Sequence, residues 1–359
     1  MNSLEQKITV WLARGGPPRS VNECFDLPIV LATDVGLRRS ENQDRVAALK
    51  ISSRGNAERP LIAVAVVDGM GGMRDGGKCA TLALSSFLCA LTLHRGKSLE
   101  ERALSAIIYA NNAVFKFAGG KGGATLSSVL VEPDQKPLIV NLGDSRIYAF
   151  GVGNNVERLT RDDSLAEAVG GHGRDLLQFV GMGPGMQPHI QSIANTIANL
   201  AITTDGIHFI EARTFEEVLV NALDLRSASQ RLSALARWCG GPDNASVAMI
   251  GLRSLFDEIR NTTVGGIEVW DPFGSLVPIW IEKEAGDVFK ADEVEGAKNA
   301  TRSQVPDYLA GDPAQDKVNA KGRSKTRRTK KSSAPKDDIQ LEIQIERSPS
   351  PDGSDEDSR

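Results

Sequence analysis

The sequence predicts an α+β fold built on antiparallel sheets, and three observations support this. Strand-like stretches follow one another over residues 29–68 with only loops between them, which is typical of hairpins and not of βαβ units. Two amphipathic helical stretches are adjacent, at 78–93 and about 98–117, and would pack as a pair against one sheet face. Short strands joined by tight turns form a meander over 125–150.

The composition is that of a soluble globular protein. The 359 residues can form two domains, or one large domain with extensions. The chain is 41% apolar and 25% charged, and its net charge of −4 excludes an overall basic surface for nucleic acid. Cys24, Cys79, Cys89 and Cys239 lack CxxC spacing. This argues against a zinc ribbon or a disulfide framework and favours a reducing compartment.

The first fourteen residues form a predicted amphipathic helix, with Leu4, Ile8, Trp11 and Leu12 on one face. Its apolar run is too short for a signal peptide, and charged residues interrupt it. No stretch of the sequence is long and apolar enough to read as a membrane span. We therefore expect a cytoplasmic protein without a transmembrane segment.

Residues 15–28 contain Gly-Gly-Pro-Pro and are predicted to be a linker, and strands are expected at 29–34 and 46–51. The valine-rich run 64–67 indicates a buried strand that ends at Asp68, directly before glycine. Glycine lets the backbone turn sharply and approach a ligand closely.

Two helices are expected next, and Ser98 with Glu101 has the spacing of a capping box that opens the second one. Residues 170–190 are glycine-rich and irregular. The remaining predicted elements of this region are strands at 125–131, 137–141, 147–150, 199–203 and 245–252, and helices at 214–223 and 228–238.

Five acids share a position at a strand terminus or tight corner: Asp44, Asp68, Asp144, Asp205 and Asp243. If the strands belong to facing sheets, these acids converge at one edge. Such a cluster is strongly repulsive unless cations neutralise it. Carboxylates without histidine or cysteine ligands favour magnesium or manganese over zinc.

Arg39 lies in the same loop as Asp44. A guanidinium binds phosphate oxygens bidentately, so acids for two metals beside an arginine indicate metal-assisted hydrolysis of a phosphoester. The competing interpretation is that Asp68-Gly69 is an ordinary turn and that Arg39 is a solvated charge paired with Glu41.

Read in order, these residues resemble the metal-dependent protein phosphatases of the 2C type, particularly the bacterial members. The resemblance covers about residues 29–252 and rests on seven blocks in the family's order. The blocks are Arg39-Ser40-Glu41-Asn42-Gln43-Asp44, Asp68-Gly69-Met70-Gly71-Gly72, Gly123-Ala124-Thr125, Asn141-Leu142-Gly143-Asp144-Ser145-Arg146, Leu159-Thr160-Arg161-Asp162, Thr204-Asp205-Gly206 and Asp243-Asn244.

The resemblance implies a four-layer α-β-β-α sandwich, in which helix pairs flank two central antiparallel sheets. It also implies a centre of two Mn²⁺ or Mg²⁺ ions at one end of the sandwich. By the same resemblance, Asp68 bridges the ions, the Gly69 carbonyl binds the second ion, and Asp205 and Asp243 complete the set.

Three further roles are implied by the resemblance. Asp44 would orient the metal-bound water, and Arg39 would hold the substrate phosphate. Asp144 matches an acid that serves a third, weaker metal site in bacterial members.

The chain departs from the family pattern at four places. Gln43 stands where the family usually has glutamate, and Met73 stands where it often has histidine. The family's Asp-His-Ser is replaced by Asp162-Asp163-Ser164. The flap that helps relatives to choose substrates is compressed into 165–174. Because every direct metal ligand is present, we expect a working enzyme.

The C-terminal part adds an extension and a tail. Strands at 265–270 and 276–284 suggest a hairpin. From about residue 286 the chain loses apolar periodicity, and we expect disorder. The expected division is an N-terminal helix and linker (1–28), a phosphatase domain (29–255), a hairpin extension (256–285) and a charged tail (286–359).

The tail has two charge blocks: residues 317–336 hold nine Lys or Arg and no acid, and 337–359 hold eight acids and two arginines. These blocks could pair with each other, and the basic one could bind nucleic acid or membrane weakly. Ile339, Leu341, Ile343 and Ile345 alternate with polar residues. This strand pattern is suited to adding to a protein partner's sheet edge.

Three functions follow from the sequence. The leading hypothesis is a Mn²⁺- or Mg²⁺-dependent phosphoserine/phosphothreonine phosphatase that acts on a Ser/Thr kinase or on its targets. The first alternative is a catalytically weak module that binds phosphoproteins, suggested by Gln43 and the short flap. A phosphodiesterase or nuclease is a third hypothesis, suggested only by the basic part of the tail.

Overall fold

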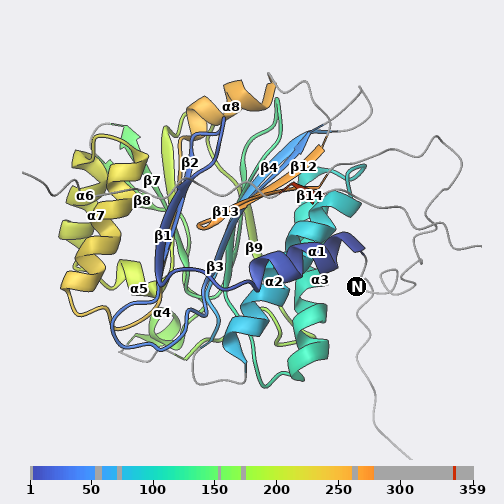
Figure 1. Ribbon diagram of the computed structural model, residues 1–359, viewed down its shortest axis with the longest axis horizontal. Helices are drawn as coiled ribbons and strands as arrows, with labels where there is room; N and C mark the ends of the chain where they lie inside the picture. The colour runs from blue at the N-terminus through green and yellow to red at the C-terminus, as the bar shows by residue number, and fades with distance from the viewer. Residues whose placement is uncertain are drawn as a thin grey trace, which may run out of the picture. The chain divides into compact units, whose positions relative to one another are not determined.

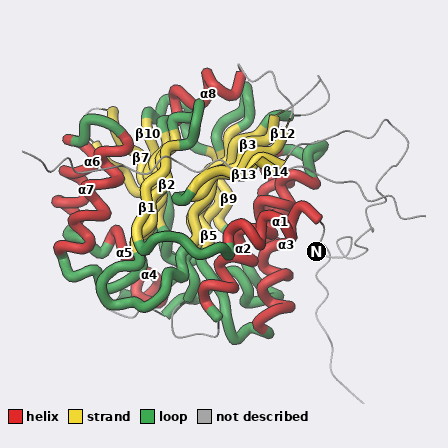
Figure 2. Tube along the Cα trace, viewed as in Figure 1, coloured by secondary structure: helices red, strands yellow, loops and turns green. Residues whose placement is uncertain are grey.

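The computed structural model describes residues 3–52, 59–70, 75–152, 155–170, 175–260, 266–278 and 343–344. Two antiparallel sheets face each other between two layers of helices, as Figure 1 shows in ribbon form and Figure 2 by element type. The predicted α+β sandwich of four layers is confirmed.

One sheet has six strands in the order β1-β2-β11-β10-β7-β8, and all its neighbouring strands are antiparallel. Its strands are β1 (Arg19–Glu23), β2 (Ile29–Asp34), β11 (Ala245–Ile250), β10 (Asn199–Thr203), β7 (Arg146–Val152) and β8 (Asn155–Arg158).

The other sheet has eight strands in the order β14-β13-β12-β3-β4-β5-β6-β9 and is also antiparallel throughout. Its strands are β14 (Ile343–Gln344), β13 (Gly274–Pro278), β12 (Gly266–Asp271), β3 (Arg45–Ser52), β4 (Leu61–Val67), β5 (Leu126–Val131), β6 (Leu138–Leu142) and β9 (His189–Ser192).

The helices cover the outer faces of the two sheets. On the eight-stranded sheet lie α1 (Ser3–Leu12), α2 (Gly76–Leu93) and α3 (Leu99–Ala118), and on the six-stranded sheet lie α6 (Ala212–Asn221) and α7 (Leu225–Trp238) (Figure 1). The shorter helices are α4 (Leu165–Val169), α5 (Asp205–His208) and α8 (Leu252–Arg260).

The layers bury three apolar clusters. One lies between the sheets and includes Leu31, Val64 and Ile202, and the other two lie under the helix layers. Strand β4 is buried at all seven positions because one face meets the other sheet and the opposite face meets α2. This explains why its sequence is a continuous apolar run with no alternation.

Several local predictions are confirmed. Ser98 caps α3 in a capping box with Glu101. Helix α1 buries Ile8, Trp11 and Leu12, as its apolar spacing predicts. It also buries Glu5, whose carboxylate accepts hydrogen bonds from Ser86 and Tyr109 and so ties α1 to α2 and α3.

Other local predictions are wrong. The expected linker 15–28 contains β1, an edge strand that pairs only with β2 and has one buried residue, so it shows no apolar alternation. The expected strand 245–252 ends at Ile250, and α8 follows it. Strand β9 begins inside the stretch 170–190 that was expected to be irregular.

The described residues up to Pro278 belong to one unit, and β12 pairs with β3 inside the eight-stranded sheet. The predicted second hairpin strand is β13, which ends at Pro278. Apart from Ile343–Gln344, the predicted tail lies outside the described residues.

Two expectations concern the cell environment. All four cysteines are free. Contrary to expectation, one segment, Gly76–Leu93, is long and apolar enough to span a membrane by length and composition. However, 78% of it is buried inside the fold, and it packs on α3 and the sheet, so we assign it as a core helix.

Candidate metal and phosphate site

The five acids lie where the sequence predicts them, at the ends of strands. Asp44 precedes β3, Asp68 follows β4, Asp144 lies in the turn between β6 and β7, Asp205 opens α5 after β10, and Asp243 precedes β11. These strands come from both sheets, so the acids approach one another across one end of the sandwich.

The pKa values show that the acids are close enough to interact. Burial raises the pKa of Asp68 well above its ordinary value, and the charges of the other four acids raise it further. Burial raises the pKa of Asp44 to about 7, with Asp205 and Asp243 adding to the effect. Burial also raises the pKa of Asp144 to about 7, and Asp205 contributes. Without a cation, the site therefore favours the protonated forms of these acids.

Asp44 is the most buried of the five acids and is 3% exposed. Its Oδ2 accepts a hydrogen bond of 3.1 Å from the Thr204 hydroxyl. Its Oδ1 is buried and has no hydrogen-bond partner among the described residues. An unpaired buried carboxylate oxygen is costly, so this atom is available to a water or another donor.

The loop that carries Asp44 is held by side chains in β2 and beside β11. The backbone N–H of Gln43 donates to Asn244 Oδ1 at 2.8 Å, and Asn244 Nδ2 donates to the Glu41 carbonyl at 2.9 Å. From the neighbouring strand β2, the Thr33 hydroxyl accepts a hydrogen bond of 2.7 Å from Asn42 Nδ2. Asn244, beside Asp243, thus supports the Asp44 loop.

Gly69 is required by close backbone packing. A Cβ at this position would overlap the Gly76 carbonyl and lie 2.8 Å from the Gln43 carbonyl oxygen. The preceding Asp68 is fixed through its backbone, since its N–H donates to the Thr125 hydroxyl at 3.0 Å and its carbonyl accepts from the Thr125 N–H at 2.9 Å. The Asp68-Gly69 turn is therefore held rigidly between β4, β5 and α2.

Arg39 pairs with Asp243, and not with Glu41 as the competing interpretation expects. Its Nη2 lies 2.7 Å from Asp243 Oδ2, and its side chain is 41% exposed. Glu41 accepts instead from Gln43 Nε2, at 2.5 Å. The hydrogen bond to Asp243 is the main cause that raises the pKa of Arg39, so this arginine stays charged at the edge of the acid cluster.

The donor chemistry fits divalent ions that prefer oxygen. Every candidate ligand is a carboxylate or a backbone carbonyl, which favours Mg²⁺ or Mn²⁺, and an ion would relieve the repulsion that raises the acid pKa values. Within the described ranges, no three His, Cys, Asp or Glu side chains are already grouped closely enough to hold one ion. The acids thus surround a common region and would have to draw together around the metals.

One site residue that sequence reasoning missed is Asp163, which the sequence marks only as a departure from the family pattern. Its Oδ2 accepts from the Gly143 N–H at 3.0 Å, beside Asp144, and its Oδ1 lies 2.8 Å from His189 Nε2. Asp163 therefore links the turn that carries Asp144 to the start of β9. No local sequence signal identifies His189 as its partner, because the two are brought together only by the fold.

Two of the predicted departures lie partly outside the described residues. Met73 belongs to the undescribed stretch 71–74, and the flap is described only for 165–170, where α4 forms.

Comparison with known proteins agrees with the fold and with the motifs. A model of the family described as protein phosphatase 2C matches residues 38–245. The protein phosphatase PhpP of Streptococcus pneumoniae is 25% identical over 247 residues, which covers 63% of this chain and 98% of PhpP.

Two solved phosphatase structures are also similar to this chain. A PPM Ser-Thr phosphatase, MsPP from Mycobacterium smegmatis, solved in complex with cacodylate, is 26% identical and has a TM-score of 0.53. The match covers 64% of this chain and 98% of MsPP. The catalytic domain of the phosphatase PstP, solved with two manganese ions, is 24% identical with a TM-score of 0.52 and shares the fold. This second match covers 62% of this chain and 96% of that domain.

Proposed function

Because the chain belongs to the protein phosphatase 2C family, we propose that it hydrolyses phosphoserine and phosphothreonine in proteins with the aid of two Mn²⁺ or Mg²⁺ ions. The main observation in favour is the convergence of five acids from the ends of strands in both sheets, with raised pKa values that a cation would lower. The substrates we propose are a Ser/Thr kinase or the proteins that it phosphorylates.

We assign the metal ligands as follows. Asp68, the Gly69 carbonyl, Asp205 and Asp243 would hold two ions, and Asp144 would serve a third. When bound, these ions supply positive charge beside the phosphate and lower the pKa of a water molecule that attacks phosphorus in line. Rigid backbone packing around Gly69 presents its carbonyl at a fixed place.

Two side chains then act on substrate and water. Arg39 can donate two hydrogen bonds to phosphate oxygens, and it would be free to do so if Asp243 served as a metal ligand. Asp44 Oδ1, which has no partner among the described residues, accepts a hydrogen bond from the attacking water, while Oδ2 stays fixed by Thr204. Arg39 thus positions the ester, and Asp44 orients the nucleophile.

Activity on a phosphoprotein is the direct test. The full chain with Mn²⁺ should release phosphate from a protein phosphorylated on serine or threonine by a kinase of the same organism, and EDTA should stop the release. A rate that is unaffected by EDTA would contradict the proposal.

Among the described residues, the Arg39–Asp243 ion pair and Gln43 support the phosphoprotein-binding alternative. Under that alternative, a phosphopeptide binds but is not hydrolysed at millimolar Mn²⁺. The nuclease alternative predicts cleavage of DNA under the same conditions, and its proposed basis, the basic part of the tail, lies outside the described residues.

A further inference from the structure

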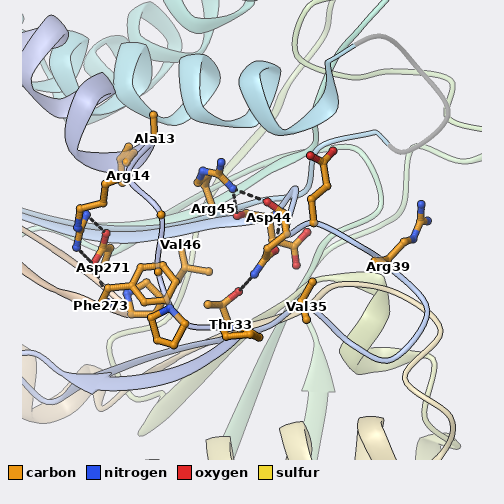
Figure 3. Close-up of a pocket in the computed structure, with 18 of the residues that line it drawn as sticks. Ala13, Arg14, Thr33, Val35, Arg39, Asp44, Arg45, Val46, Asp271 and Phe273 are labelled. Carbon is orange, nitrogen blue, oxygen red and sulfur yellow. Dashed lines mark hydrogen bonds and ion pairs between the residues drawn. The ribbon is translucent and has the colours of Figure 1, made fainter. Parts of the chain in front are cut away.

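A pocket of about 490 Å³ lies beside the acid cluster and is walled largely by parts of the chain outside the matched residues 38–245. One wall is the segment 12–18 that follows α1, and another is the turn 271–273 between β12 and β13. The floor is formed by the ends of β2 and β3 and by the loop from Arg39 to Asp44 (Figure 3).

The two outer walls are locked to each other. Arg14 forms a bidentate ion pair with Asp271, with distances of 2.5 and 2.7 Å, and its guanidinium carbon lies 3.3 Å from the centre of the Trp11 ring. Asp271 is 3% exposed. A buried bidentate pair of this kind fixes the geometry of both segments, so the pocket is already formed in the free protein.

A second set of contacts ties the same turn to the other sheet. The Ser20 hydroxyl on β1 donates to the Pro272 carbonyl at 2.5 Å, and Asn22 Nδ2 donates to the Asp271 carbonyl at 2.8 Å. The ring of Phe273 lies against the backbone of Gly16, where a Cβ would come within 2.6 Å of it. The N-terminal segment and the hairpin turn therefore form one rigid rim across both sheets.

The pocket is lined by both apolar and polar side chains. Phe273 and Arg39 lie at opposite ends (Figure 3). The apolar side chains of the lining are Leu12, Ala13, Pro17, Pro18 and Phe273. Arg14 and Arg45 bring positive charge to the lining, and Arg14 is paired with Asp271. The lining also includes Arg39 and Asp44, which belong to the candidate catalytic site.

We infer that this pocket is a substrate subsite, which receives an apolar side chain near the phosphorylated residue while Arg39 holds the phosphate. The volume is within the range of ligand sites, which are mainly apolar with a few placed polar groups. Phe273, Pro17 and Pro18 offer an aromatic and proline surface, on which an apolar side chain packs better than a charged one. The inference rests on the proposed phosphatase function and adds a substrate preference to it.

The test compares two phosphopeptides that differ only in having leucine or alanine at one position, scanned on both sides of the phosphoserine. At one position the full chain with Mn²⁺ should prefer leucine by about tenfold in kcat/KM. Phe273→Ala and Gly15→Leu should bring this ratio close to one. Gly15 lines the pocket, and a Cβ added there would have no other atom within 4 Å, so its leucine fills space without a clash.

Matched controls should keep the wild-type ratio. Phe117→Ala removes an aromatic ring that is 49% exposed on α3, and Gly96→Leu adds a side chain at another glycine with no atom within 4 Å of the new Cβ. Because the readout is a ratio within each variant, a loss of folded protein does not change it.

The inference is overturned if no position shows a preference, or if the ratio survives both pocket variants. It is also overturned if activity per enzyme falls as protein concentration rises, since a second copy of the chain would then occupy the pocket. If wild type hydrolyses neither peptide nor p-nitrophenyl phosphate, the proposed function fails, and the same peptides then test the subsite through their binding ratio by fluorescence polarisation.

Discussion

Arg39 is placed to pair either with Asp243 or with a substrate phosphate. This position determines how its replacement should affect activity and stability. Arg39 is ion-paired with Asp243 at 2.7 Å and stands at the edge of a cluster of acids. The side chains of Arg39 and Asp243 are 41% and 20% exposed, so their ion pair contributes little to stability. We therefore expect the charge of Arg39 to matter for phosphate binding more than for folding.

Arg39→Ala should therefore lower kcat/KM for p-nitrophenyl phosphate by about 10- to 100-fold, as expected for the loss of hydrogen bonds to a charged group. The melting temperature should stay close to that of wild type. Arg213→Ala, which removes an exposed arginine paired with Glu217 on α6, is the control and should change neither quantity. Equal activity of the two variants would exclude a phosphate-binding role for Arg39.

Gly69→Ala should destabilise the protein by about 1–3 kcal/mol, because its methyl group overlaps the backbone of Gly76 and has no flexible neighbour to displace. The free energy of unfolding from urea denaturation measures this. Gly96→Ala, with no atom within 4 Å of the new Cβ, should leave stability nearly unchanged, and a similar loss in both variants would refute the packing argument.

At the scale of elements, the start of α3 is a feature that the sequence identifies down to single residues. Ser98 accepts from the Glu101 N–H, and the Glu101 carboxylate accepts from the Ser98 N–H. Such caps satisfy backbone groups that the helix itself leaves unpaired.

Ser98→Ala should cost about 1 kcal/mol of stability and should lower the melting temperature without affecting phosphatase activity, since α3 lies on the outer layer. Glu101→Gln keeps an oxygen acceptor for the Ser98 N–H and should be milder. A larger effect of Glu101→Gln than of Ser98→Ala would show that the carboxylate charge, and not the cap, stabilises this end.

For the whole molecule, the acid cluster makes stability depend on pH. Asp44 and Asp144 have pKa values of about 7 when folded, against an ordinary 3.8. The folded protein thus binds protons that the unfolded chain has already released. Stability from these groups is complete below pH 3.8 and is lost as pH rises to about 7. His208, buried with its pKa lowered by burial, has the opposite effect below its ordinary 6.5.

Asp144→Asn isolates the acid contribution. In EDTA, this variant should melt at a higher temperature than wild type at pH 8 and at a similar temperature near pH 4. Saturating Mn²⁺ should remove the advantage, because the ion stabilises the ionised carboxylate of wild type. A variant that is less stable than wild type at pH 8 in EDTA would show that the ionised carboxylate of Asp144 does not destabilise the fold.

The sequence predicts most of the fold because its strong patterns are local. The valine run before Asp68, the capping box at Ser98 and the strand 199–203 all fall where expected. The strand and turn pattern also placed five acids at strand ends, and the family assignment is confirmed. Edge strand β1 was not predicted, because a strand with one buried residue shows no periodic pattern of apolar residues.

Long-range contacts could not be predicted from such patterns. The Asp163–His189 pair and the Arg14–Asp271 ion pair join residues that are 26 and 257 positions apart. Only the closed sandwich brings them together, so the rim beside the pocket has no counterpart in any local motif.

Titration with Mn²⁺ by calorimetry tests the central claim, that the converging acids hold a two-metal centre. The wild-type chain should bind at least two ions, and Asp68→Asn, which changes the predicted bridging ligand, should lose most of this binding. Asp134→Asn, an acid in the turn between β5 and β6, should bind as wild type does. No binding to wild type at millimolar Mn²⁺, or unchanged binding to Asp68→Asn, would contradict the account.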